Sequence, residues 1–434
     1  MKNQTFFFNT LPQWIIILMP FLLISGPFLS DLGVSVVSIL FLINSKINNL
    51  NRYYNNNYFR FFLIFCIILI LSSLLSENRF ASLKNSLFYF RFGIFSLCFW
   101  YLLDINKKFI NYLFFSLLIC FLSLIVDGYI QYIFGKNLFG YKLYSEYRVS
   151  SFFGSELILG SYLARFFPIL FGLFIYINRL NKKNNKLLFV ITIVFILSEG
   201  LIFLSGERLA LFFMNLSAVY IILMLREYKI YRLWTYLVSL GLIILMISIF
   251  PNSKERFVDQ TINDFTRNTL NNDTNVDDKI YIFSKPHNDM YISAYRIFLD
   301  NKFFGIGPRQ YRNICHEYKV SEYSCETHPH NTYMELLSES GIFAFLLVTG
   351  FFILICGLSI RHFICKLIRV NGDLINDFEV CLLSALIISL WPFSPSGSFF
   401  NNWMSIVYYF PAGLLLWQRS KFKNSPKTKK IDTQ

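Results

Sequence analysis

The sequence predicts an all-α polytopic membrane protein with about 12 transmembrane helices and a large helical outer loop between the ninth and tenth spans. Hydrophobic residues make up 55% of the 434 positions and charged residues only 15%, whereas soluble domains carry roughly one quarter charged residues. About twelve apolar segments approach the roughly 20 residues that a helix needs to cross a bilayer. The polar stretch 251–331 interrupts them, and we expect it to lie outside the membrane.

The apolar segments follow one another through short polar connections. We place the spans at 11–29, 32–44, 59–75, 84–103, 109–127, 157–177, 187–204, 209–225, 233–250, 341–360, 378–393 and 402–417. The second is short and can instead form half of a hairpin with the first. These segments divide the chain into a membrane domain at 1–250, an outer loop at 251–340, a second membrane domain at 341–418 and a basic tail at 419–434.

The basic residues predict the orientation, because Lys and Arg concentrate in cytoplasmic loops. With the N-terminus inside, the inner segments hold 22 of the 40 Lys and Arg residues, and every inner loop is basic. Twelve spans with both ends inside fit this distribution. The net charge of +14 therefore reflects topology. No basic face or recognition module accompanies it, so we expect no nucleic-acid partner.

Two cysteines stand apart from the other six, which fall in spans or in an inner loop and are expected to be small apolar residues. Cys315 and Cys325 form the one pair in the outer loop. A disulfide between them would close a loop of about ten residues and stabilise the fold by about 2–3 kcal/mol in the chain-entropy model. Two free thiols or a metal-binding pair are the alternatives.

Arginines at the outer surface are candidates for anion binding. Arg208 follows Ser205-Gly206-Glu207 in a short outer connection, where the positive-inside tendency makes an arginine unexpected. A snorkelling membrane anchor is the alternative for Arg208. Arg148 precedes the entry of the sixth span and is a second outer candidate.

An amphipathic helix is predicted at about 289–301, because apolar residues recur there at helical spacing. A tight turn, Gly305-Ile306-Gly307-Pro308, follows it, and Arg309 and Arg312 come directly after. Exposed amides with two guanidinium groups suit a phosphate, whose oxygens arginine matches bidentately. A connecting turn with solvated arginines is the alternative.

Residues 328–341 form a histidine motif, His-Pro-His-Asn-Thr-Tyr-Met-Glu-Leu-Leu-Ser-Glu-Ser-Gly. His330 is the candidate base, because histidine titrates near neutral pH and can take a proton from an attacking hydroxyl. Asn331 or Thr332 is expected to cap a short helix at 332–339. Glu335 and Glu339 then lie one turn apart just below His330, positioned to orient it.

A zinc site is the alternative for the histidine motif. His328 and His330 would then bind the metal with His287, His316 or a cysteine. The intervening proline and the scattered spacing fit no standard zinc site, so we expect no metal and no cofactor.

Three ionisable residues fall well inside predicted spans: Arg91, Arg165 and Glu199. Such groups face the interior of a helix bundle and pair there. We expect Arg91 to pair with Glu199.

The pattern His330-Asn331, nine residues and then Gly341, with the Gly-Ile-Gly turn upstream, resembles the O-antigen ligase and O-antigen polymerase superfamily. These proteins are integral inner-membrane glycosyltransferases of the GT-C class with a large periplasmic loop between late spans. The resemblance covers most of the chain in topology and residues 280–345 in motif.

The resemblance implies roles for individual residues. Arg208 matches the arginine that holds the lipid diphosphate, and His330 matches the essential histidine. A second family arginine falls here at His287, so Arg296, Arg309 or Arg312 would have to supply that contact. The further substrate-binding candidates are His328, Asn331, Glu335 and Glu339, together with Arg148.

The resemblance also implies the reaction and its partners. A glycan moves from undecaprenyl diphosphate to an acceptor hydroxyl on the periplasmic face of the bacterial inner membrane. The acceptor is lipid A–core in a ligase or a second lipid-linked glycan in a polymerase, and the histidine-asparagine pair favours the ligase. A transporter for lipid-linked sugars is a different class. Such proteins often contain internal repeats, and this chain shows none.

Overall fold

The computed structural model describes residues 6–145, 148–180, 184–249, 254–262, 284–368 and 374–423. Across these ranges the chain is helical, and they contain no β-strand. Two isolated antiparallel bridges occur near Lys136 and Tyr144. Parts of the predicted outer loop (251–253 and 263–283) and the predicted tail from 424 onward lie outside the described residues.

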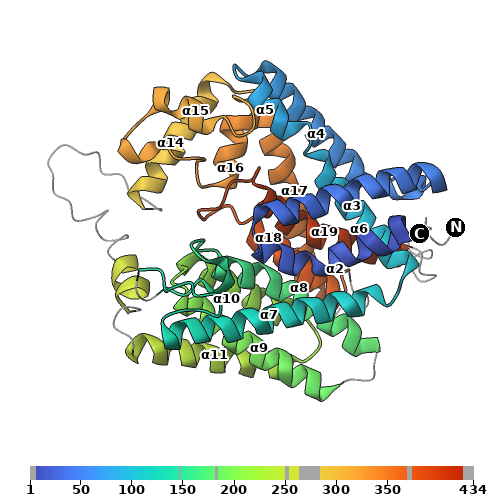
Figure 1. Cartoon of the computed structure of the whole chain (residues 1–434), viewed down its shortest axis with the longest axis vertical. Coiled ribbons are helices and arrows are strands. Elements are labelled where there is room, and N and C mark those ends of the chain that lie inside the picture. The colour runs from blue at the N-terminus through green and yellow to red at the C-terminus, as the bar shows by residue number, and fades with distance from the viewer. Residues whose placement is uncertain are drawn as a thin grey trace.

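An apolar helix corresponds to each of the twelve predicted spans. They are α2 (Leu11–Ile24), α3 (Pro27–Asn48), α4 (Asn57–Leu75), α6 (Phe90–Ile105), α7 (Phe109–Phe134), α8 (Leu159–Leu180), α9 (Asn185–Leu204), α10 (Arg208–Met224), α11 (Lys229–Ile249), α17 (Gly341–Leu367), α18 (Asp377–Ser389) and α19 (Asn402–Lys423). The short helix α5 (Arg79–Ser86) precedes α6. In Figure 1, α2 begins and α19 ends on the same side of the bundle.

Length and hydropathy identify nine helices among the described residues as candidate membrane spans. The chain is therefore a multi-pass membrane protein. The helix α10 is apolar but has only 17 residues, and α18 has 13. Neither these two nor α19 is among the nine, so the count of twelve spans stays a prediction.

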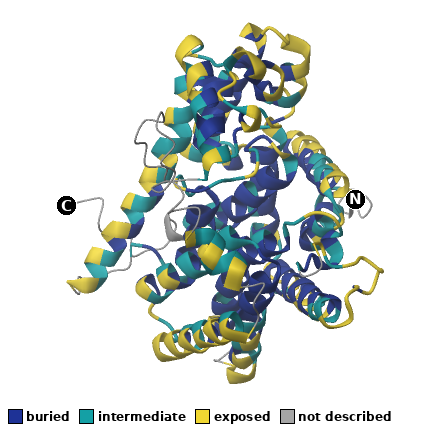
Figure 2. Ribbon diagram, turned by 90° about the vertical axis from the view of Figure 1, so that its left-hand side faces the viewer, coloured by how far each residue is buried: buried dark blue, intermediate teal, exposed yellow. Residues whose placement is uncertain are grey.

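The core of the bundle surrounds α8, which packs against α7, α9, α10 and α18. A second set of contacts joins α6 to α3 and α19. Figure 2 shows buried residues concentrated in the middle of the molecule and exposed ones on its periphery. The exposed side chains of α4, α11 and α17 are largely apolar, which is expected for helices that face lipid.

The expected pair of Arg91 with Glu199 is wrong. The guanidinium group of Arg91 donates to Asp31 Oδ1 at 2.6 and 2.9 Å and to Asn402 Oδ1 at 3.1 Å. The carboxylate of Glu199 instead accepts a hydrogen bond from Ser239. The reason is the packing order: α6 contacts α3 and α19, whereas α9 contacts α11.

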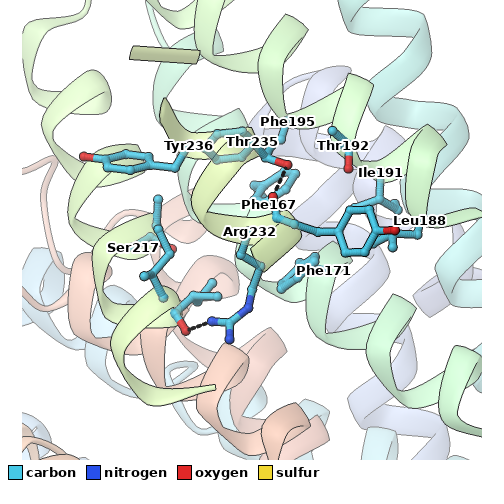
Figure 3. A pocket seen from close by; sticks show the side chains of 14 residues that line it. Phe167, Phe171, Leu188, Ile191, Thr192, Phe195, Ser217, Arg232, Thr235 and Tyr236 are labelled. Atoms are coloured by element: carbon cyan, nitrogen blue, oxygen red, sulfur yellow. Dashed lines mark hydrogen bonds between the residues drawn. The ribbon is translucent and has the colours of Figure 1, made fainter. Parts of the chain in front are cut away.

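Arg232 of α11 closes the C-terminal end of α10. It donates to the backbone oxygens of Ile221, Leu225 and Glu227, the last two at 3.0 and 2.8 Å. Ile221 lies in the last turn of α10, and Leu225 and Glu227 follow its end. A cation there stabilises the C-terminal end of the helix dipole. Figure 3 shows Arg232 beside a small cavity of about 50 Å³ that α8 to α11 enclose.

Residues 284–340 form a compact unit between α11 and α17, which we call the loop subdomain. Its elements are α14 (Lys285–Asp300), α15 (Tyr311–Ile314), three short helical turns at Cys315–Tyr318, Glu322–Ser324 and Leu336–Ser340 (η7), and α16 (Thr332–Glu335). A small apolar core holds it together, separate from that of the bundle. The helix α14 includes the predicted amphipathic helix but begins earlier, because Pro286 occupies its first turn, where proline is favoured.

Candidate functional site

Three histidines meet at one edge of the loop subdomain. The ring of His330 lies 4.1 Å from that of His328 and 5.8 Å from that of His287, measured between centroids. His330 has a positive φ of 51°, an uncommon conformation for a residue with a side chain. The backbone N–H of Ser396 donates to the His330 carbonyl at 2.8 Å. This contact helps to hold the strained turn.

Glu326 is the carboxylate beside His330. Its Oε2 lies 2.8 Å from His330 Nε2, and the carboxylate is about half exposed. Sequence reasoning assigned this orienting role to Glu335 or Glu339, and the structure places both of them elsewhere. The expected helix after His330 does form, but Glu335 and Glu339 lie on its buried face.

Glu335 and Glu339 are buried and hold backbone in place. Glu335 accepts hydrogen bonds from Ser398 Oγ at 2.6 Å and from the Phe399 N–H at 2.7 Å. Glu339 accepts from the N–H groups of Arg309 and Tyr311 at 2.6 and 2.8 Å. Both carboxylates therefore tie the histidine motif to neighbouring segments.

The glycine turn at 305–308 does not present open amides, contrary to the sequence-based expectation. The N–H of Ile306 donates to Ser338 O at 3.0 Å, and that of Gly307 donates to Glu339 O at 2.8 Å. The Gly305 N–H donates to Asn301 O at 3.0 Å. These amides are satisfied within the protein, and two of them bind the turn to η7. They are therefore not open to a phosphate, which would have to be bound by side chains.

Arg309 and Arg312 lie near the histidines. Arg309 Nη1 is 3.4 Å from Asn85 Oδ1, and Arg312 is exposed. Burial, followed by the positive charges of His330, Arg312 and Arg309, lowers the pKa of His328 to about 3. His328 is therefore neutral at physiological pH.

Asn331 caps α16 and anchors it to the segment before α19. Its side-chain oxygen accepts from the N–H groups of Tyr333 and Met334 at 3.0 and 3.1 Å, as a helix N-cap does. Its amide nitrogen donates to Pro392 O at 2.9 Å and Ser394 O at 3.2 Å. We call residues 391–401 the bridging segment.

Three arginines gather at the connection between α9 and α10. Arg148 Nε donates to Ser205 O at 2.9 Å, and Arg256 Nε donates to Gly206 O at 2.6 Å. Arg208, the first residue of α10, donates to Thr261 Oγ1 at 3.1 Å. We call Arg148, Arg208 and Arg256 the arginine cluster. Sequence reasoning missed Arg256, although it too is a basic residue on the predicted outer side.

Glu207 lies beside the arginine cluster and caps the start of α8. Its carboxylate accepts from the N–H groups of Gly160 and Ser161 at 2.7 and 3.0 Å. Burial raises the pKa of Glu207 to about 7, while the two amides and the charges of Arg148 and Arg165 oppose that shift. The group thus titrates near physiological pH.

The bridging segment contacts both α10 and the residue that follows His330. Phe212 lies one turn after Arg208 on α10, and its ring centroid is 6.2 Å from that of Trp391. The next residue, Pro392, accepts the hydrogen bond of Asn331, which adjoins His330. The bridging segment therefore contacts α10, which begins at Arg208, and Asn331, which adjoins His330.

Cys315 and Cys325 face each other within the loop subdomain, with Cα atoms 5.6 Å apart and their sulfur atoms in disulfide contact. That separation suits a disulfide. The ligand atoms of Cys315, His316 and Cys325 all lie within 4.8 Å of one another, so the arrangement also suits a metal ion if the thiols are reduced. In the described part of the chain this is the one such group, and it excludes His328 and His330.

His287 stands on α14 at the position that the resemblance assigns to a second arginine. Its Nδ1 lies 2.6 Å from Ser284 Oγ, and its ring meets that of His330 nearly edge-on. The structure thus brings His287, His328 and His330 together. Arg148 and Arg208 lie in the arginine cluster, and Arg309 and Arg312 approach from the glycine turn.

No curated protein shows significant sequence similarity to the chain. Residues 191–349 match the sequence model of a family described as O-antigen ligase. The match runs from α9 into α17 and includes Arg208, Arg256 and the whole histidine motif. It supports ligase- or polymerase-like glycan transfer by a membrane enzyme that uses lipid-linked glycans. The match at residues 191–349 supports the O-antigen ligase and polymerase superfamily that the motifs indicate.

Proposed function

We propose that this protein moves a glycan from undecaprenyl diphosphate to an acceptor hydroxyl of lipid A–core or a similar molecule. The reaction takes place on the periplasmic face of the bacterial inner membrane. One observation carries the proposal: the bridging segment bonds to Asn331, next to the carboxylate-paired His330, and also contacts α10, which begins at Arg208 of the arginine cluster. Together they supply a base and an anion-binding site.

The base in this proposal is His330. With Nε2 at Glu326, the other ring nitrogen, Nδ1, takes the proton of the acceptor hydroxyl as its oxygen bonds to the anomeric carbon. Glu326 stabilises the imidazolium that forms, as a carboxylate partner does in other general-base pairs. His328 stays neutral and adds no competing positive charge.

The arginines hold the leaving group. The bond between the anomeric carbon and the phosphate oxygen breaks, and the lipid diphosphate leaves with the electron pair. Guanidinium groups fixed in advance stabilise that developing charge. We assign this role to Arg148, Arg208 and Arg256. Arg309 or Arg312 would contact the glycan part of the donor.

Replacing Arg208 or His330 by alanine tests this assignment. Each variant should lose glycan transfer, by about a hundredfold or more, while membrane insertion stays normal. Surface glycan in complemented cells and transfer by purified protein are the measurements. Arg226→Ala, at the other end of α10, and His316→Ala, in the same subdomain, serve as controls. Near-normal transfer by either Arg208→Ala or His330→Ala would show that its assigned role is wrong.

A polymerase that joins lipid-linked repeat units is the second candidate, because it needs the same base and arginines. A strain without the gene separates the two. Loss of all glycan from the lipid A–core indicates a ligase, whereas core capped with a single repeat unit indicates a polymerase. Movement of unmodified lipid across liposome membranes would instead indicate a transporter.

A further inference from the structure

A large apolar cavity lies among α4, α17, α18 and α19. Its volume is about 570 Å³, within the range of about 300–1,000 Å³ that is typical of sites for organic ligands. Aromatic rings make up half of its lining: Tyr58, Phe61, Phe62, Phe65, Phe351, Phe399, Tyr408 and Tyr409. The other lining residues are aliphatic or glycine.

The cavity is open toward the surface of the bundle. Phe61 of α4 is 57% exposed, and Leu346 and Leu354 of α17 are 56% and 68% exposed. In contrast, Phe62 and Phe399 on its inner side are buried. Both α4 and α17 are candidate membrane spans, so the opening faces lipid chains rather than water.

The wall of the cavity contacts the short helix that follows the histidines. Phe399 lines the cavity, and its backbone N–H donates to Glu335 at 2.7 Å. Leu390 also lines it, and its carbonyl accepts from the Tyr333 hydroxyl at 2.7 Å. Glu335 and Tyr333 belong to the short helix that follows His330 and Asn331. The cavity thus lies in the membrane part of the protein, next to the helix that carries the end of the histidine motif.

We propose that this cavity, which we call the tail groove, binds the isoprenoid chain of the lipid-linked donor. The inference rests on the proposed function, because it places the tail of the same substrate. A methyl-branched, unsaturated chain packs well on aromatic rings. A single groove among these helices suits one chain, whereas an acceptor of the lipid A kind carries several acyl chains side by side.

A glycine in the groove offers a specific test. A Cβ atom added at Gly350 meets no heavy atom within 4 Å, and Gly350 lines the cavity. The substitution Gly350→Phe therefore adds a bulky ring at the groove, and its first carbon meets no protein atom. Gly357 lies two turns further along α17, also has open space around its Cβ position and does not line the cavity. Gly357→Phe is the matched control.

Kinetics with donors of different chain length give the first readout. Gly350→Phe should raise the KM for the undecaprenyl donor about tenfold while kcat stays near normal, which is the signature of lost substrate binding. A donor with a chain of two or three isoprene units should be affected far less. Gly357→Phe should resemble the wild type with both donors. Equal KM values for Gly350→Phe and Gly357→Phe would overturn the proposal.

Photolabelling of the purified protein gives a second readout that needs no transfer. The probe is a polyprenyl diphosphate with a diazirine near the far end of its chain. We expect labelled residues on α4 or α17 facing the groove, and loss of that labelling in Gly350→Phe but not in Gly357→Phe. Labelling elsewhere, or full displacement by diacyl phospholipid, would overturn the tail groove.

The two proposals fail in different ways. Labelling of the groove combined with normal transfer by Arg208→Ala and His330→Ala would keep the tail groove and remove the proposed catalytic roles. Labelling away from the groove combined with inactive Arg208→Ala and His330→Ala would support the catalytic roles and refute the tail groove.

Discussion

The contact between Glu326 and His330 determines how His330 can act as the proposed base. At 2.8 Å the carboxylate fixes the imidazole and neutralises it when it is protonated. Glu326→Gln keeps the shape and removes the charge. We expect kcat to fall about tenfold or more, a part of the total general-base contribution, with little change in KM.

Glu326→Asp separates the role of the negative charge from that of the side-chain shape. It should recover part of the rate that Glu326→Gln loses, because a shorter carboxylate still stabilises the imidazolium. Glu322→Gln, at an exposed position in the same subdomain, is the control and should leave the rate near normal. A change in KM alone, with kcat unchanged in Glu326→Gln, would contradict the positioning role.

His328 should make the protein less stable in acid. The pKa of His328 is lowered from its usual 6.5 to about 3 by burial. The unfolded chain therefore binds a proton that the folded chain does not, so stability falls as pH drops from about 6.5 toward 3. His328→Asn removes this group, and its unfolding temperature should depend less on pH than that of the wild type. Parallel curves for the two proteins between pH 7 and pH 5 would refute the prediction.

The sequence alone indicated some of the residues of the candidate site but not others. Arg208 and His330 stand in recognisable motifs, and Arg208 lies where the positive-inside tendency makes an arginine unexpected. Glu326 gives no such signal, because Pro329 and the left-handed turn at His330 break the regular spacing between the two residues. Arg256 lies in a polar stretch without a motif, and only the fold brings it to Gly206.

At the scale of elements, the clasp between the glycine turn and η7 holds the histidine motif. Gly305 has a φ of +65°, and a Cβ atom there would lie 2.4 Å from the carbonyl carbon of Glu339. Ser72 of α4 donates to the same Glu339 carbonyl at 2.9 Å, which joins the clasp to the membrane bundle. The clasp thus fixes the start of α17 against α4.

Replacing Gly305 by alanine should disrupt this clasp. The side chain would meet backbone atoms that cannot move aside, in a conformation that disfavours it by about 1–2 kcal/mol. Gly140→Ala is the control, since Gly140 has a φ of +87° but open space around its Cβ position. We expect Gly305→Ala to lower the unfolding temperature clearly more than Gly140→Ala. Similar losses for both would show that strain alone, and not the clasp, matters at Gly305.

Helices were more predictable than their contacts. The twelve apolar segments each contain a helix because hydrophobic length alone requires one in a bilayer. Periodicity also predicted α14. The turn at 305–308 could not be interpreted from sequence, because its amides are satisfied by residues 338 and 339, and local sequence does not reveal that pairing.

At the scale of the whole molecule, the bridging segment 391–401 is what brings distant parts of the chain together. It contacts Phe212 on α10 and Asn331 beside His330, and its Phe399 lines the tail groove. The composition predicted the helical membrane class, and the motifs predicted the superfamily. The pairing of Arg91 with Asp31 instead of Glu199 shows that helix order in sequence does not fix which helices touch.

The central claim is that Arg208 and His330 act on one lipid-linked donor. A cryo-EM structure with an undecaprenyl-diphosphate-linked glycan bound tests it most directly. The account predicts the diphosphate within hydrogen-bond distance of the Arg208 guanidinium group, the sugar beside His330 and the isoprenoid chain in the tail groove. A headgroup bound away from either side chain would contradict the account.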